Sequence, residues 1–109
     1  MRALIVGLIC LAAGSASARS GDRCLLVVDG KTYLDGPCPV DVKPGGNYMI
    51  GNTKKITYFA TVQSKGVGAA AGFWNEQRGA GDARTPLGDL RQNGPCWTND
   101  RAVICAWWR

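Results

Sequence analysis

Apolar and polar side chains alternate with the period of a β-strand between Lys55 and Gln63. The apolar positions, which share one face, are Ile56, Tyr58, Ala60 and Val62. The polar positions on the other face are Lys55, Thr57, Thr61 and Gln63, with Phe59 as an apolar exception. Residues 64–66 predict a turn and residues 68–74 a returning strand. The small residues at 69–72 indicate a close backbone approach or a bulge there.

The same pattern predicts further short strands. Leu25–Val28 and Lys31–Leu34 flank Asp29-Gly30, a dipeptide that suits a two-residue hairpin turn with positive φ. The glycine-rich residues 76–86 predict an exposed loop, and residues 87–90 a short strand. We therefore predict an all-β fold, a small antiparallel sheet of six to eight short strands. The sheet is expected to be closed or sandwiched, which would hide its edges.

The last hairpin has a register that can be written residue by residue. If Asp100-Arg101 is a two-residue turn, Trp97 lies opposite Ile104 and Cys96 lies opposite Cys105. Directly opposed residues that form no ladder hydrogen bonds are about 4.5 Å apart at Cα, close to the lower limit for a disulfide. The sequence therefore predicts a Cys96–Cys105 disulfide.

Elimination then pairs Cys24 with Cys38. The Asp29-Gly30 turn sets Cys24 opposite Asp35, so this disulfide requires a bend at Gly36-Pro37. The crossed pattern, Cys24–Cys105 with Cys38–Cys96, is the alternative.

The first 18 residues have the pattern of a secretory signal peptide. Met1-Arg2 gives a basic start, residues 3–13 are continuously apolar, and Ala16-Ser17-Ala18 is a small-x-small cleavage site. The apolar run is about half the roughly 20 residues that a membrane-spanning helix needs. We predict that residues 1–18 are removed and that residues 19–109 form one secreted or periplasmic domain without a transmembrane segment. An oxidising compartment favours disulfides over metal ligands or redox thiols.

Charge narrows the classes of partner. The chain has 13 Lys and Arg against 8 Asp and Glu, for a net charge of +5, which becomes +4 when Arg2 leaves with the signal. Basic charge favours anionic partners such as envelope polymers, and a solvated surface is the alternative. An exported chain with no basic run longer than Lys54-Lys55 is not expected to bind nucleic acid. The excess falls in residues 42–81, where Glu76 is opposed by Lys43, Lys54, Lys55, Lys65 and Arg78.

The chain contains no histidine. It cannot form a Ser-His or Cys-His nucleophile pair, and it offers no imidazole to zinc. We expect no cofactor, no metal site and no catalytic centre. An acid-catalysed hydrolase using Glu76, the only glutamate, is a remote alternative. It would need a second carboxylate within roughly 5–10 Å, such as Asp82 or Asp89.

Residues 73–78, with the sequence FWNEQR, carry the most varied chemistry. In a binding role, Trp74 would stack on a flat ligand while Asn75, Glu76 or Arg78 makes hydrogen bonds. In the alternative, the aromatic side chains belong to the core and the polar ones to a solvated turn. We expect Trp74 to be partly buried, with one edge exposed beside Glu76.

A second group of aromatic residues lies at the end of the sequence. Strand alternation sets Trp107 and Trp108 on opposite faces, with Trp97 on the face of Trp108. An exposed Trp108 would serve glycan stacking or a protein interface. Coverage of both faces, or a Trp108 that caps the core, is the alternative.

The sequence resembles a class of small exported bacterial proteins that are usually described as hypothetical. The resemblance implies a periplasmic or secreted bacterial location and carries over no activity or site residue. It spans nearly the whole of residues 19–109 and depends on residues 33–38, 58–60, 72–75, 86–90, 94–97 and 104–107.

Together these features predict a non-catalytic exported binding domain in or around a bacterial cell envelope. The expected ligand is a glycan or anionic envelope component, contacted by aromatic and basic residues. The alternative is a protein-interaction or hydrolase-inhibitor domain similar to the lysozyme inhibitors. A net charge of +4 would slow association with a cationic lysozyme.

Overall fold

The computed structural model describes residues 22–51 and 57–108. The predicted signal peptide, Lys54, Lys55 and Ile56 lie outside the described residues. The described residues form a nine-stranded antiparallel sheet with the order β3-β2-β10-β9-β8-β7-β6-β5-β4. The elements are β2 (Arg23–Val28), β3 (Lys31–Pro37), β4 (Val40–Val42), the 3-10 turn η2 (Pro44–Gly46), β5 (Tyr48–Ile50), β6 (Ala60–Gly66), β7 (Ala69–Trp74), β8 (Thr85–Asn93), β9 (Cys96–Thr98) and β10 (Ala102–Trp107).

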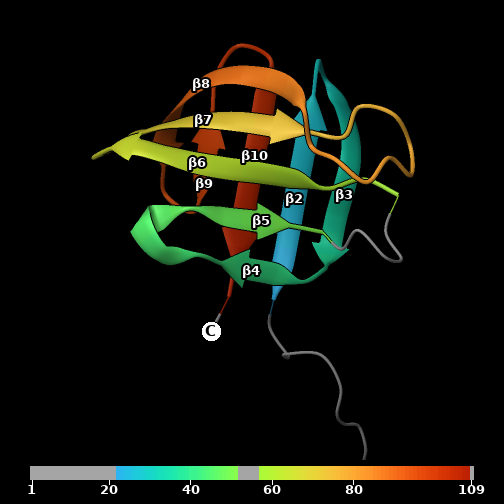
Figure 1. Ribbon diagram of the computed structural model, residues 1–109, viewed down its shortest axis with the longest axis horizontal. Helices are drawn as coiled ribbons and strands as arrows, with labels where there is room; N and C mark the ends of the chain where they lie inside the picture. The colour runs from blue at the N-terminus through green and yellow to red at the C-terminus, as the bar shows by residue number, and fades with distance from the viewer. Residues whose placement is uncertain (1–21, 52–56, 109) are drawn as a thin grey trace, which may run out of the picture.

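The sheet bends into a half-barrel. Figure 1 shows β4, β5, β6 and β7 crossing in front of β10, β2 and β3. Alternate residues of β2 and β7 are buried, because strand side chains point to opposite faces and the inner face forms the core. The largest fully buried apolar side chains are Leu26, Val40, Ile50, Val62, Leu87, Leu90 and Ile104.

The predicted antiparallel β fold is confirmed, with nine strands instead of six to eight. The sequence patterns missed β4 and β5, which have three residues each and are too short to display an alternation. The hydrogen-bonded order ends at β3 on one side and at β4 on the other. Closure of the sheet between them stays a prediction.

The register predicted for the last hairpin is confirmed. Trp97 lies opposite Ile104 and Cys96 opposite Cys105, and the two cysteines form a disulfide with their Cα atoms 4.0 Å apart. This bond fixes the end of β9 to β10, and both strands carry tryptophans.

The Cys24–Cys38 disulfide is also confirmed, with a Cα separation of 5.7 Å. The predicted pairing of Cys24 with Asp35 is wrong, because a bulge in the β2–β3 pair shifts Cys24 opposite Gly36. The bulge and the positive φ of Gly36 provide the bend that this disulfide requires.

Two predicted boundaries of the β6–β7 hairpin need correction. β6 begins at Ala60 and runs to Gly66, so the turn is Val67-Gly68 and not residues 64–66. The alternation is confirmed from Ala60 onward, whereas Phe59 precedes the strand and is buried.

The predicted close approach is found at Gly72. A Cβ on Gly72 would lie 2.7 Å from Leu90 Cδ1, and the β7–β8 pair has a bulge after Gly72. A side chain there would force the Leu90 methyl group to shift. The loop between β7 and β8 spans residues 75–84, and β8 extends well beyond the predicted 87–90.

Candidate functional site

Trp74 lies in the core at the end of β7. Only 3% of its surface is exposed, so the prediction of an exposed edge beside Glu76 is wrong. Tyr33 packs edge-on against the Trp74 ring with a centroid separation of 4.6 Å, and Tyr58 stacks at 6.0 Å. These two tyrosines leave the indole no open face on which a flat ligand could stack.

The Asn75 side chain connects the segment before β6 with the loop after β7. Its Oδ1 accepts a hydrogen bond from the Phe59 backbone N–H at 2.8 Å, and its Nδ2 donates to the carbonyls of Thr57 and Ala80 at 3.0 Å each. The side chain is 2% exposed. The amide thus uses its acceptor and both donors within the chain, because burial of an unpaired amide is costly.

Glu76 and Arg78 are exposed in the loop after Asn75. Arg101 donates from Nε to Asp29 Oδ1 at 3.1 Å. This bond, the Asp29 charge and, to a smaller extent, the Glu76 charge raise the pKa of Arg101. Glu76 therefore lies near the Asp29–Arg101 pair, and its role in binding stays a prediction, as does that of Arg78.

The two carboxylates considered as partners of Glu76 in acid catalysis form ion pairs. Asp82 pairs with Arg84 at 3.1 Å, and Asp89 pairs with Lys65 at 2.8 Å. Both pairs are exposed, so water competes with each interaction.

Exposed apolar side chains gather at the opposite end of β6 and β7. Trp108 is 46% and Trp107 38% exposed. One groove is lined by all the large apolar side chains that are exposed in the described part of the chain. These four residues are Val42, Val67, Trp107 and Trp108. Single apolar residues scattered over a surface are normal, whereas a group in one place indicates a binding surface.

The groove, which we call the tryptophan groove, consists of two adjoining hollows. The first has a volume of about 330 Å³ and the second of about 540 Å³. Both hollows share Tyr48 from β5, Gln92 from β8, Trp97 from β9 and Trp108 after β10. A site whose residues come from several strands cannot be found by reading one segment of sequence.

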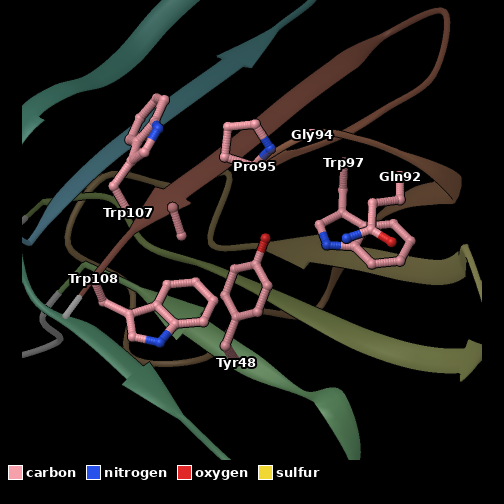
Figure 2. A pocket seen from close by; sticks show the side chains of 8 residues that line it. Tyr48, Gln92, Gly94, Pro95, Trp97, Trp107 and Trp108 are labelled. Carbon is pink, nitrogen blue, oxygen red and sulfur yellow. The ribbon is translucent and has the colours of Figure 1, made fainter.

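Trp107 and the Gly94-Pro95 turn form one side of the first hollow (Figure 2). The Ala106 backbone N–H donates to the Pro95 carbonyl at 3.2 Å, which fixes this turn against the end of β10. The Arg23 guanidinium lies 5.7 Å from the centroid of the Trp107 ring, within the range of a cation–π contact. The turn thus fixes the backbone of Ala106, and the arginine contacts the ring of the next residue, Trp107.

Tyr48 occupies the floor of the groove. Its ring centroid lies 5.7 Å from that of Trp108 at an angle of 49°, and Figure 2 shows its hydroxyl directed toward the side where Pro95 lies. The residue is 7% exposed, and its buried hydroxyl has no hydrogen-bond partner among residues 22–51 and 57–108. Burial raises the pKa of Tyr48 above its usual range, so this hydroxyl keeps its proton.

The sequence indicated Trp108 as a site residue and set Trp97 on the same strand face, but it did not indicate Tyr48 or Gln92. Tyr48 belongs to a strand of three residues, and Gln92 lies in a part of β8 that we did not predict. No local signal marks either residue, because each becomes part of a site only when the sheet bends.

Among the described residues, no three His, Cys, Asp or Glu side chains are grouped to hold a metal ion. No helix in the described ranges is long and apolar enough to cross a membrane. Comparisons with protein-family models, curated proteins and solved structures found no match to this chain.

Proposed function

We propose that this protein is an exported, non-catalytic binding domain that contacts a glycan or anionic component of a bacterial envelope through the tryptophan groove. The observation that carries the proposal is that exposed Trp107 and Trp108 line a hollow together with Tyr48, whose buried hydroxyl has no partner in the described part of the chain. Ligand sites typically have apolar walls and a few polar groups that set orientation.

Flat aromatic surfaces favour a sugar ligand over an extended charged polymer. Tryptophan presents a large apolar face and one N–H group, which suits the mixed apolar and polar surface of a sugar ring. The two disulfides are compatible with an extracellular or periplasmic protein, where such glycans occur.

Retention on purified peptidoglycan sacculi tests this proposal. Mature protein should sediment with sacculi, and Trp108→Ala should remain in the supernatant with a thermal midpoint within a few degrees of the parent. Arg78→Ala is the control, because Arg78 is exposed in the loop at the other end of β7. Equal retention of the parent and Trp108→Ala would remove the groove from the proposal.

A protein partner is the second candidate function, and one observation favours it. Val67 lies fully exposed at the tip of the β6–β7 hairpin, and half-exposed Val42 lies on the same rim of the groove. Exposed apolar residues of this kind mark protein interfaces. A hydrolase inhibitor would use this hairpin as its anchor.

Capture from periplasmic extract separates the two candidates. If the partner is a protein, one enzyme should co-purify with the parent protein, and Val67→Asp should lose that enzyme. Under the glycan reading, sacculi alone retain the protein.

A further inference from the structure

We propose that the tryptophan groove recognises the neutral acetamido group of an N-acetylated amino sugar, with the Tyr48 hydroxyl donating a hydrogen bond to the acetamido carbonyl. This inference depends on the proposed glycan-binding function and names the chemical group that the groove selects.

The charge of the groove points to a neutral ligand. Among the described residues, none that lines either hollow carries a charged side chain, although the chain as a whole has a net charge of +5. Lys43 and Lys65 pair with Asp41 and Asp89 at 3.0 and 2.8 Å. The Arg23 guanidinium lies 5.7 Å from the Trp107 ring but does not line either hollow. An anionic group inside the groove would therefore lose its hydration without direct contact with a cation.

The Tyr48 hydroxyl points to an acceptor on the ligand. It is buried, it is unpartnered within the described chain, and its raised pKa keeps it protonated, so it is available as a donor. An amide carbonyl is a stronger acceptor than a sugar hydroxyl and carries no charge. The methyl group beside that carbonyl would lie against the ring of Trp108, which is 5.7 Å from the Tyr48 ring.

Gln92 offers the complementary half of an amide pair. Its side chain lines both hollows beside Trp97 (Figure 2) and makes no hydrogen bond in the described part of the chain. Its carbonyl oxygen would accept from the acetamido N–H while Tyr48 donates to the acetamido carbonyl. A planar amide between aromatic side chains would thereby be bound on both of its polar edges.

The size and construction of the groove suit this ligand. The hollow of about 330 Å³ is near the small end of ligand pockets and suits one sugar unit, and the adjoining hollow takes the next. Access to the buried hydroxyl requires the walls to part. Trp108 lies beyond the last paired residue of β10, Trp107, so no strand ladder fixes its backbone.

Three β-1,4-linked tetrasaccharides test the inference by titration calorimetry with the mature protein. The N-acetylglucosamine oligomer carries the acetamido group, the glucose oligomer has a hydroxyl in its place, and the glucosamine oligomer has an ammonium. We expect the acetylated oligomer to bind about tenfold more tightly than the glucose oligomer, and the cationic glucosamine oligomer to bind most weakly.

Tyr48→Phe keeps the ring and removes only the hydroxyl. We expect a roughly threefold to tenfold loss of affinity for the acetylated oligomer and no change for the glucose oligomer. Gln92→Leu is a second variant on an exposed side chain and should also weaken binding of the acetylated oligomer alone. A thermal scan verifies that each variant is folded.

Equal affinity of the parent for the acetylated and glucose oligomers, or no binding of either, would overturn the acetamido inference. The same holds if Tyr48→Phe and Gln92→Leu both retain full preference. The proposed function survives each of these results if Trp108→Ala still abolishes retention on sacculi. It falls separately if retention on sacculi is insensitive to Trp108→Ala.

Discussion

Near each end of the β6–β7 hairpin a tryptophan lies beside a tyrosine, but one pair belongs to the core and the other lines a groove. At one end Trp74 is 3% exposed between Tyr33 and Tyr58. At the other end Trp108 is 46% exposed beside Tyr48. The same residue types therefore build a core in one place and a groove in the other. What separates them is whether neighbouring segments cover the indole.

The polar atoms at the two ends show a related difference. Asn75 makes three hydrogen bonds through its amide, which hold segments 57–59 and 80. At the Trp108 end, the buried Tyr48 hydroxyl has no partner among the described residues, and the exposed Gln92 side chain lines the same hollow. The Trp74 Nε1 atom is also buried without a partner in the described part of the chain, but the two tyrosines cover its ring. A polar group that makes its hydrogen bonds within the chain stabilises the fold, whereas a buried polar group without a partner beside a hollow remains available to a ligand.

The substitution with the largest expected effect tests directly whether Trp74 and Trp108 differ in burial. Trp74→Ala should destabilise the fold by about 3–5 kcal/mol, because it removes a buried aromatic side chain and leaves a cavity. Trp108→Ala should cost less than about 1 kcal/mol, since half of that side chain already contacts water. Urea unfolding followed by far-UV circular dichroism measures both. Equal losses in the two variants would mean that Trp108 belongs to the core.

Removal of the Cys96–Cys105 disulfide tests how far the groove depends on the pairing of β9 with β10. Replacing both cysteines with Ala should destabilise the protein by about 2–4 kcal/mol, because the bond limits the unfolded chain. It should also weaken sacculi binding in the fraction that stays folded, since β9 and β10 carry Trp97 and Trp107. Non-reducing peptide mapping of the parent should link the two cysteines, and a Cys38–Cys96 peptide would contradict the hairpin register.

The last hairpin could be predicted residue by residue because two independent constraints agree there. A two-residue turn fixes the register, and the disulfide requires Cys96 and Cys105 to lie opposite each other. The first hairpin had only its turn as a constraint. A turn alone does not reveal the bulge after Leu26, which moves the partner of Cys24 from Asp35 to Gly36.

The candidate site could be predicted only in part. Alternation shows which face of a strand Trp74 or Trp108 occupies, but it does not show whether another segment covers that face. Tyr33 comes from β3, far from Trp74 in sequence, and it closes over Trp74 only when the sheet bends. Tyr48 reaches the groove by the same bending. Long-range coverage of this kind leaves no local pattern in the sequence.

Tyr48 gives a prediction of intermediate size that depends on pH. Its pKa is raised by burial in the folded protein, whereas the unfolded chain releases the proton near pH 10. The folded state thus holds more protons above pH 10, and stability should fall there by up to about 1.4 kcal/mol per pH unit. Urea midpoints between pH 8 and 11.5 measure this fall. Tyr48→Phe should flatten the decline, and an unchanged decline would mean that the Tyr48 hydroxyl is not buried.

The smallest expected effect concerns Glu76, the charged residue next to Asn75. Glu76→Gln keeps the shape and removes the charge, and an exposed side chain of this kind should change stability by less than about 0.5 kcal/mol. Arg101, whose pKa the Glu76 charge helps to raise, is paired with Asp29 and would remain paired. Sacculi retention of Glu76→Gln should equal that of the parent, because the tryptophan groove lies at the other end of the hairpin. A clear loss of retention, with the thermal midpoint unchanged, would mean that the ligand also contacts the loop at residues 75–84 and that the two ends form one extended binding surface.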